Sequence, residues 1–168
     1  KSYKTVYIQI DEGPRVKIKE IQVSGNISQP PSYYANFIEN NSSDLIESGY
    51  YNRADLVDAG YKNLTTHLKN QGYLRAKIQS ARVEFLNKKS TALVQVVIDE
   101  GPLTQVRKIS FEGNKAYSDL ELQNELQVKS NSPLRLNQLE NSIFKLKKHY
   151  LSNGYLEMKI LNKDEDLI

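Results

Sequence analysis

A segment that occurs twice constrains the fold of this chain more than any other feature of its sequence. Residues 8–26 (IQIDEGPRVKIKEIQVSGN) resemble residues 96–114 (VVIDEGPLTQVRKISFEGN), at an offset of 96 − 8 = 88. A second block, residues 67–78 (HLKNQGYLRAKI), resembles residues 149–160 (HYLSNGYLEMKI), at an offset of 149 − 67 = 82. Two blocks in the same order at nearly the same spacing indicate two tandem copies of one small domain. The smaller second offset predicts a shorter connection between the blocks of the second copy.

Each copy predicts the same order of strands and helices. In the first copy, residues 17–23 alternate between apolar and polar, as a strand does, and lead into a Gly-Asn turn. A short helix is expected over residues 32–39. Residues 81–86 and 91–101 are separated by the polar turn NKKS and predict two further strands. With a second helix before them, the order is strand, helix, helix, strand, strand.

That second helix has the clearest pattern in the chain. Asn52 and Asn137 are candidate N-caps in the two copies, and Gly72 and Gly154 stand where a left-handed residue would end each helix. Between cap and glycine, apolar residues recur at the spacing of one helix face. In the first copy these residues are Val57, Tyr61, Leu64 and Leu68, and in the second Leu139, Ile143, Leu146 and Tyr150.

Short connections then set the order of the strands in the sheet. The last two strands of a copy form an antiparallel hairpin, and the first strand, followed by two helices, lies parallel to the last. The last strand is therefore central, and the middle strand is left at an edge with unpaired backbone groups. This edge is a candidate binding site for an extended peptide, which would add to it through main-chain hydrogen bonds. The opposing interpretation is that Arg82, Glu84 and the nearby Lys88 and Lys89 protect the edge from pairing. The candidate edge residues are Ala81, Arg82, Val83, Glu84, Phe85 and Leu86.

The adjacent acids of the repeated IDEGP motif raise the question of catalysis. Asp11 and Glu12, and likewise Asp99 and Glu100, are neighbours in a strand, so their side chains project to opposite faces and cannot converge on one substrate. We expect them to solvate the strand end while Gly-Pro turns the chain into the next unit.

Other catalytic, metal-binding and cofactor-binding patterns are missing from the sequence. The only histidines, His67 and His149, occupy equivalent positions in different copies and have no metal-ligand spacing around them. Cysteine is absent, and we found no nucleophile motif, P-loop or dinucleotide fingerprint. The formal charge of +3 is spread along 168 residues, which gives little support to a nucleic-acid partner. We therefore predict a protein that is not an enzyme and has no catalytic residue, no metal and no cofactor.

The repeated unit resembles the POTRA domain of BamA-type outer-membrane assembly proteins. The resemblance covers nearly the whole chain and rests on EGP, followed by an alternating strand that ends in Gly-Asn, and on Gly-Tyr after the second helix. It implies an α+β fold of tandem β-α-α-β-β units, each a three-stranded mixed sheet covered on one face by two helices. The repeat-motif residues that carry the resemblance are Gly25, Asn26, Gly72, Tyr73, Gly113, Asn114, Gly154 and Tyr155.

The resemblance also divides the chain. Residues 1–14 are expected to be the last strand of a preceding POTRA unit, residues 15–102 a complete unit, and residues 103–168 a unit without its last strand. We accordingly expect a fragment of a longer protein. A hinge is expected at each unit boundary, where a rigid proline adjoins glycine. The hinge residues are Gly13, Pro14, Gly101, Pro102 and Leu103.

The function that the resemblance implies is a periplasmic segment of an outer-membrane protein assembly and insertion factor, on the periplasmic side of the bacterial outer membrane. Its expected partners are unfolded segments of β-barrel clients, the lipoproteins of the assembly complex and the protein's own C-terminal β-barrel. TamA-type assembly factors and two-partner secretion transporters are close alternatives. A POTRA-like scaffold module of a cell-division protein is an alternative of a different class.

Overall fold

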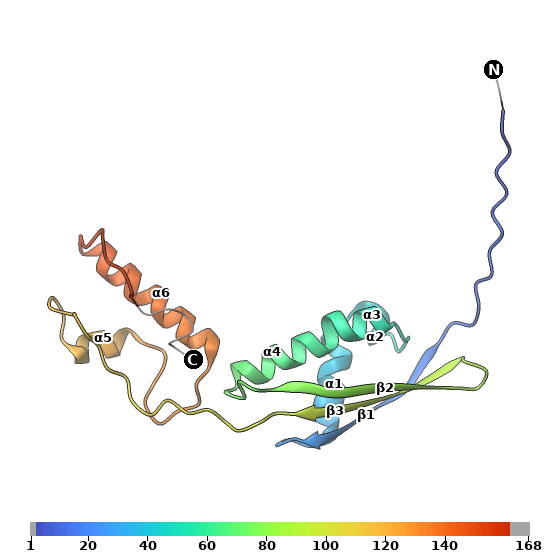
Figure 1. Cartoon of the computed structure of the whole chain (residues 1–168), viewed down its shortest axis with the longest axis horizontal. Coiled ribbons are helices and arrows are strands. Elements are labelled where there is room, and N and C mark those ends of the chain that lie inside the picture. Colours follow the sequence, from blue (N-terminus) through green and yellow to red (C-terminus); the bar gives the residue numbers. More distant parts are fainter. Residues whose placement is uncertain (1–2, 162–168) are drawn as a thin grey trace. The chain divides into compact units, whose positions relative to one another are not determined.

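The computed structural model describes residues 3–161, which form two compact units (Figure 1). The first unit runs to Leu64 and takes in Ile78–Ile98; the second takes in Thr65–Lys77 and continues from Asp99. The elements, in chain order, are β1 (Lys17–Asn26), α1 (Pro31–Asn40), α2 (Asp44–Glu47), α3 (Arg53–Asp55), the π-helix η1 (Leu56–Tyr61), α4 (Lys62–Asn70), β2 (Lys77–Leu86), β3 (Thr91–Asp99), α5 (Asp119–Glu125) and α6 (Leu136–Ser152).

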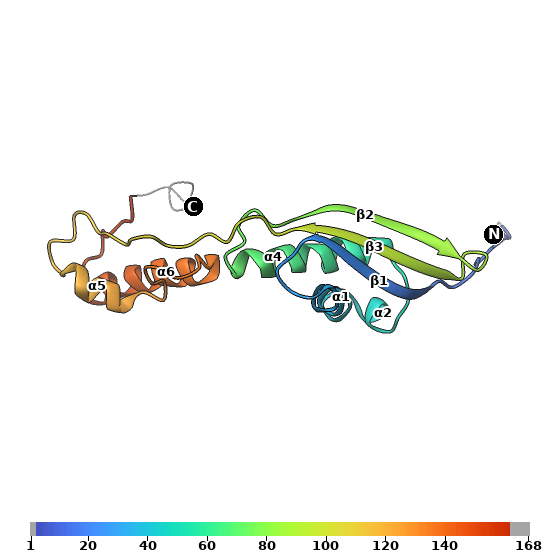
Figure 2. The same cartoon turned by 90° about the horizontal axis from the view of Figure 1, so that it is seen from below.

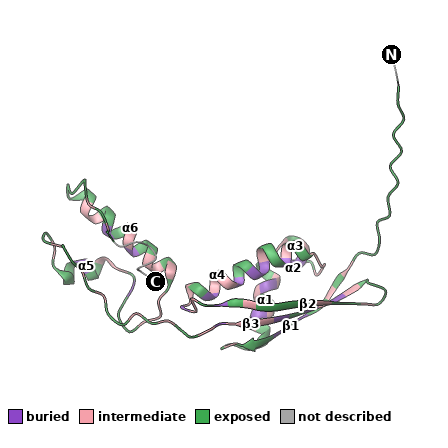
Figure 3. Cartoon of the chain, viewed as in Figure 1, coloured by how far each residue is buried: buried purple, intermediate pink, exposed green. Residues whose placement is uncertain are grey.

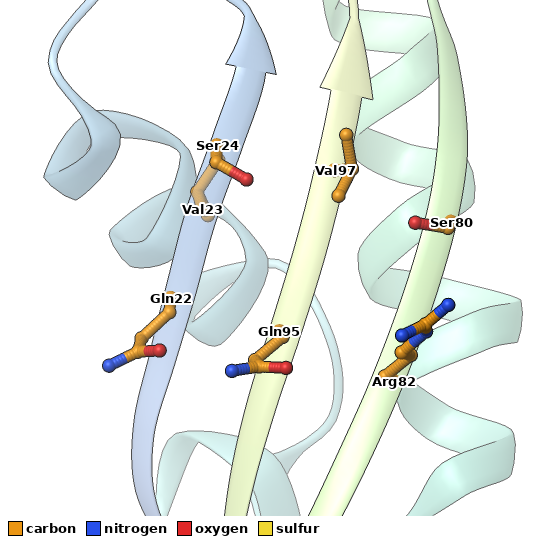
Figure 4. Close-up of a pocket in the computed structure, with 7 residues that line it drawn as sticks. All are labelled: Gln22, Val23, Ser24, Ser80, Arg82, Gln95 and Val97. Atoms are coloured by element: carbon orange, nitrogen blue, oxygen red, sulfur yellow. The ribbon is translucent and has the colours of Figure 1, made fainter.

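The sheet confirms the predicted topology. Its strand order is β1-β3-β2, so the last strand is central and β2 lies at an edge. β1 and β3 run in the same direction, as their arrowheads show in Figure 4, and the helices of the first repeat copy lie on one face of the sheet (Figure 2). On that face β3 buries every second side chain, namely Ala92, Val94, Val96 and Ile98 (Figure 3).

The first helix, α1, packs against β1 through a buried face. Tyr34 and Ile38 are fully buried, while Phe37, one position before Ile38, is only half-buried. The predicted range of this helix is confirmed, since α1 extends the expected residues by one at each end.

α3, η1 and α4 follow one another without a break and together form the predicted second helix of the first unit. Asn52 caps this helix as predicted: its side-chain oxygen accepts the N–H groups of Ala54 at 2.9 Å and Asp55 at 3.4 Å. The predicted cap Asn137 is wrong. The N-cap of α6 is Arg135, so Asn137 already lies inside the first helical turn, and its side-chain oxygen accepts the N–H of Gln138.

The π-helix accounts for a one-residue difference between the two second helices. Their N-caps lie 135 − 52 = 83 residues apart, whereas the glycines that follow them lie 154 − 72 = 82 apart. The helix of the first unit thus has one extra residue, and a π turn is the form in which a helix accommodates an insertion. Because the turn shifts the register, Leu56 is buried and Val57 is 43% exposed. The prediction that Val57 belongs to the buried face was wrong.

Gly72 and Gly154 end the two helices in the same way, as predicted. Both have positive φ, +105° and +89°. The N–H of Tyr73 donates to the carbonyl of Leu68, and the N–H of Tyr155 to that of Tyr150, each at 3.1 Å. These paired bonds are those of a helix end closed by a left-handed residue.

The second unit contains the two helices of the repeat. Ser118 and Glu121 form a capping box at the start of α5, and the buried Ser142 hydroxyl of α6 accepts the N–H of Gln127 at 2.9 Å. Residues 103–161 contain no strand, although the isolated bridge of Gln105 with Pro133 repeats that of Lys17 with Tyr50. The alternating residues after Pro102 have no ladder neighbour in this part of the chain, and a strand needs one.

Residues 3–16 have no regular secondary structure. The large apolar side chains of residues 3–10 are strongly exposed, from 75% for Ile10 to 91% for Tyr7. The assignment of residues 1–14 to a preceding unit, and the boundaries at 15–102 and 103–168, stay predictions.

Candidate peptide-binding edge

β1 and β2 each have one edge that faces away from the central strand β3, and these two edges differ in how far other backbone segments cover them. The start of β1 is covered by residues 49–51: the N–H of Ile18 donates to the carbonyl of Gly49 at 2.8 Å, and the N–H of Tyr51 to that of Val16 at 3.0 Å. In the described part of the chain, backbone hydrogen bonds from outside the sheet ladder do not reach residues 77–86. The predicted edge residues Ala81 to Leu86 all lie on this second, uncovered edge.

An open apolar groove of about 240 Å³ runs between β2 and the second helix. β2 contributes Ala81 and Val83 to it, and Phe85 lies next along the same side of the strand. The Phe85 ring contacts the Tyr51 ring edge to face, with the ring centres 5.5 Å apart. The residues on the opposite wall are Tyr51, Arg53, Leu56, Val57 and Tyr61.

The helix wall of this groove was missed from the sequence, because Val57 and Tyr61 were assigned to the core. Val57 follows the buried Leu56 within the π-helix and lines the groove. The signal was present in the repeat, since matching Leu56 rather than Val57 to Leu139 reveals the inserted residue. π turns are frequent at functional sites.

The other side of β2 is polar. Ser80 and Arg82 point to the open face of the sheet, beside Gln95 of β3 and Gln22 of β1, as Figure 4 shows. These side chains line a wide depression of about 570 Å³, together with Val23, Ser24 and Val97. Alternate residues of β2 therefore border an apolar groove and a polar face, as the period-two geometry of a strand requires.

The two IDEGP motifs form the same local turn. Asp11 accepts the N–H of Gly13 at 3.2 Å, and Asp99 accepts the N–H of Gly101 at 3.1 Å. The two glycines have φ of +60° and +67°. The expectation that the acids only solvate the strand end was wrong for Glu100, which is 3% exposed.

The other predicted residues lie in turns. Leu103, after the second Gly-Pro, is 41% exposed. The side chain of Asn114 donates to the carbonyl of Tyr117 at 3.1 Å and to Asp119 at 2.8 Å, so the second Gly-Asn leads into α5. The hinge function of Gly13, Pro14, Gly101, Pro102 and Leu103 stays a prediction.

Residues 3–161 hold no group of three or more His, Cys, Asp or Glu residues arranged to bind a metal ion. His67 and His149 are both half-buried; His67 lies 2.9 Å from the side-chain nitrogen of Gln71, and His149 packs against the Tyr117 ring. Over the same residues, none of the helices has the length and apolar character needed to cross a bilayer.

Burial of Tyr61 in the groove wall makes the stability of the first unit sensitive to alkaline pH. Burial, and to a lesser degree the neighbouring Tyr51, raises the pKa of Tyr61 from 10.0 to about 12. Below pH 10 Tyr61 is protonated in both states, and above it the unfolded chain alone gains from ionisation. With solvent screening allowed for, we expect the free energy of unfolding to fall by about 1 kcal/mol between pH 10 and pH 12. Urea unfolding of wild type and Tyr61→Phe measures this loss, which the variant should lack; equal losses would contradict the assignment.

Comparisons with known proteins agree with one another on the fold of this chain. The family model described as POTRA, surface antigen variable number repeat, matches residues 16–101 and again residues 104–167. A putative outer membrane protein assembly factor of Treponema pallidum (strain Nichols) is 26% identical over 163 residues. That alignment covers 94% of this chain but only 18% of the relative, so the chain corresponds to a small part of that protein.

Two crystal structures share the fold. The structure of Haemophilus influenzae BamA POTRA3-5 has a TM-score of 0.52 at 18% identity, covering 81% of this chain and 50% of that one. The structure of BamA from Haemophilus ducreyi lacking POTRA domains 1-3 has a TM-score of 0.55 at 20% identity, covering 79% and 24%. At these identities the likeness concerns the fold alone.

Proposed function

Since the chain belongs to the POTRA family, we propose that it is the periplasmic POTRA segment of an outer-membrane protein assembly factor and that β2 receives unfolded client segments by β-augmentation. The function is non-catalytic: the segment binds clients, and partner lipoproteins, on the periplasmic side of the outer membrane. The observation that carries the proposal is the uncovered β2 edge beside an apolar groove.

The groove and the polar face together fit one kind of client. A strand added to β2 would place alternate side chains beside Val57, Ala81 and Val83, and the others beside Ser80 and Arg82. Main-chain hydrogen bonds would supply affinity for any extended segment, and the groove would favour apolar residues at every second position. Segments of outer-membrane proteins, which alternate between apolar and polar, meet this requirement.

The opposing interpretation, a protected edge, has little support from the placement of the charges. Lys88 and Lys89 have φ of +55° and +67° and lie in the turn after β2, not along the strand. Arg82 and Glu84 do lie along β2, but they carry opposite charges and so give the edge no single sign of charge with which to repel a charged strand. Edge protection relies on charge, proline or a covering segment along the edge itself.

The test is a proline in the edge. Glu84→Pro removes a backbone donor from β2, and we expect binding of a ten-residue peptide that alternates valine with threonine to weaken at least ten-fold. Isothermal titration measures the binding, and circular dichroism checks that helix content is unchanged. Glu84→Thr is the matched control, because it removes the charge and keeps the N–H, and it should bind as wild type does. Unchanged binding by a folded Glu84→Pro variant would refute the proposal.

A further inference from the structure

The outer face of α6 in the second unit exposes two large apolar side chains. Phe144 is 67% exposed and Leu151 is 45% exposed. They are seven residues apart, which is two helical turns, or about 10.5 Å along the axis on the same side of the helix. The buried residues of α6, Ser142 and Leu146, belong to the opposite side.

The first unit shows what this helix position looks like in the other copy of the repeat. Alignment on Gly72 and Gly154 pairs Phe144 with Lys62 and Leu151 with Lys69. Both lysines are exposed, and Lys62 makes a surface ion pair with Asp58 at 3.0 Å. That copy of the repeat has its three-stranded sheet, and both lysines are nevertheless exposed. The exposure of Phe144 and Leu151 is thus not caused by the lack of strands in residues 103–161.

The neighbouring positions differ in charge as well. Lys145, Lys147 and Lys148 are all exposed around the apolar pair, and their equivalents in the first copy of the repeat are the neutral Asn63, Thr65 and Thr66. Two lysines have been exchanged for apolar residues, and three neutral residues for lysines. The result is an apolar stripe bordered by positive charge, where the first unit has an ordinary solvated helix surface.

We propose that this α6 patch, defined as Phe144, Leu151 and the lysines 145, 147 and 148, is a docking surface for an acidic amphipathic helix of a partner protein. Apolar side chains two turns apart match the seven-residue repeat with which helices pack side by side. The bordering lysines complement acidic residues at the edge of such a helix and would steer its approach. The site lies in the second unit, and it is independent of client binding at β2.

A membrane surface is the main alternative occupant of a basic, apolar helix face. One phenylalanine and one leucine form a small apolar face for holding a protein on a bilayer, where stable anchoring takes a larger apolar surface or a second signal. Glu140, one turn before Phe144, lies on the same side of the helix and would oppose anionic lipid. The helix of a partner protein can accommodate Glu140, because a single position of that helix, the one opposite Glu140, can lack an acidic residue.

The experiment exchanges the residues of the two units. The probe is a synthetic 21-residue helical peptide with leucine at heptad positions a and d and glutamate at the flanking positions, titrated into the full chain. We expect Phe144→Lys with Leu151→Lys, which installs the residues of the first copy of the repeat, to weaken binding at least ten-fold. Lys145→Gln with Lys147→Gln and Lys148→Gln should weaken it several-fold and reduce its salt dependence. A peptide with lysine in place of glutamate should not bind, and Glu84→Pro should have no effect.

The transplanted patch gives the complementary result. Lys62→Phe with Lys69→Leu, together with lysine at positions 63, 65 and 66, should add a second binding site for the acidic peptide. Vesicles with 30% phosphatidylserine test the alternative by co-sedimentation. Absence of peptide binding to the wild-type chain, or vesicle binding that depends on Phe144 and Leu151, would overturn the proposal.

Discussion

Deletion of Val57 should leave the first unit folded and weaken binding of an alternating strand peptide at least ten-fold. The deletion removes the inserted residue of η1, so that Leu56, Tyr61, Leu64 and Leu68 acquire the regular helical spacing of their equivalents in α6. The second unit demonstrates that the repeat forms this helix without a π turn. The groove beside β2 loses its exposed apolar residue, and a ten-fold loss corresponds to about 1.4 kcal/mol.

The variant Val57→Ala, compared with wild type and with the deletion, separates the effect of the π turn on binding from the effect of the valine side chain. Val57→Ala keeps the turn and removes only methyl groups, so its binding should lie between those of wild type and the deletion variant. Titration with the valine-threonine peptide gives the affinities, and helix content by circular dichroism reports on folding. A folded deletion variant with the affinity of wild type would show that the groove has no part in client binding, whatever the role of the backbone edge.

The fold of the first unit was predictable because its signals agree with one another. The apolar run of β3, the Asn52 cap and the glycine after α4 each mark one element, and the order of elements left few ways to pair three strands. The nearly continuous apolar run of β3 is typical of a central strand, and β3 is central, with Val94, Val96 and Ile98 buried. These elements depend on local chemistry that a sequence displays directly.

The predictions that failed share a different cause. Asn137 is a good cap residue, but the N-cap of α6 is Arg135, two residues earlier, and its side chain makes no capping hydrogen bond, so residue type does not mark the start of this helix. Val57 has the right spacing for a regular helix and the wrong one for a π turn. Residue type indicates that an element exists, whereas an insertion of one residue alters which side chains it buries.

Glu100 illustrates the limit of reasoning from composition. A carboxylate at the end of an exposed loop is normally solvated, and nothing in IDEGP distinguishes Glu100 from Glu12. Yet Glu100 is buried and Glu12 is exposed, because residues 65–77 and 99–104 pack within one compact unit, whereas residues 3–16 have no such neighbours in the described chain. Tertiary context decides burial here, and it cannot be read from five residues.

Gly25→Ala should destabilise the first unit by about 3 kcal/mol, while Gly113→Ala at the equivalent position of the second repeat should cost about 1 kcal/mol. Both glycines have positive φ, +119° and +82°, so both substitutions strain the backbone. They differ in what an added Cβ would meet. At Gly25 it would run into the backbone carbonyl of Ile98 in the central strand, and at Gly113 it would meet no atom within 4 Å. Native-state hydrogen exchange measures the local loss of stability, at the amides of Val96 and Ile98 for Gly25→Ala and at those of the buried Leu122 and Leu146 for Gly113→Ala. Equal effects of the two substitutions would mean that the conformation at Gly25, and not its close contact with β3, is what requires a glycine in the repeat.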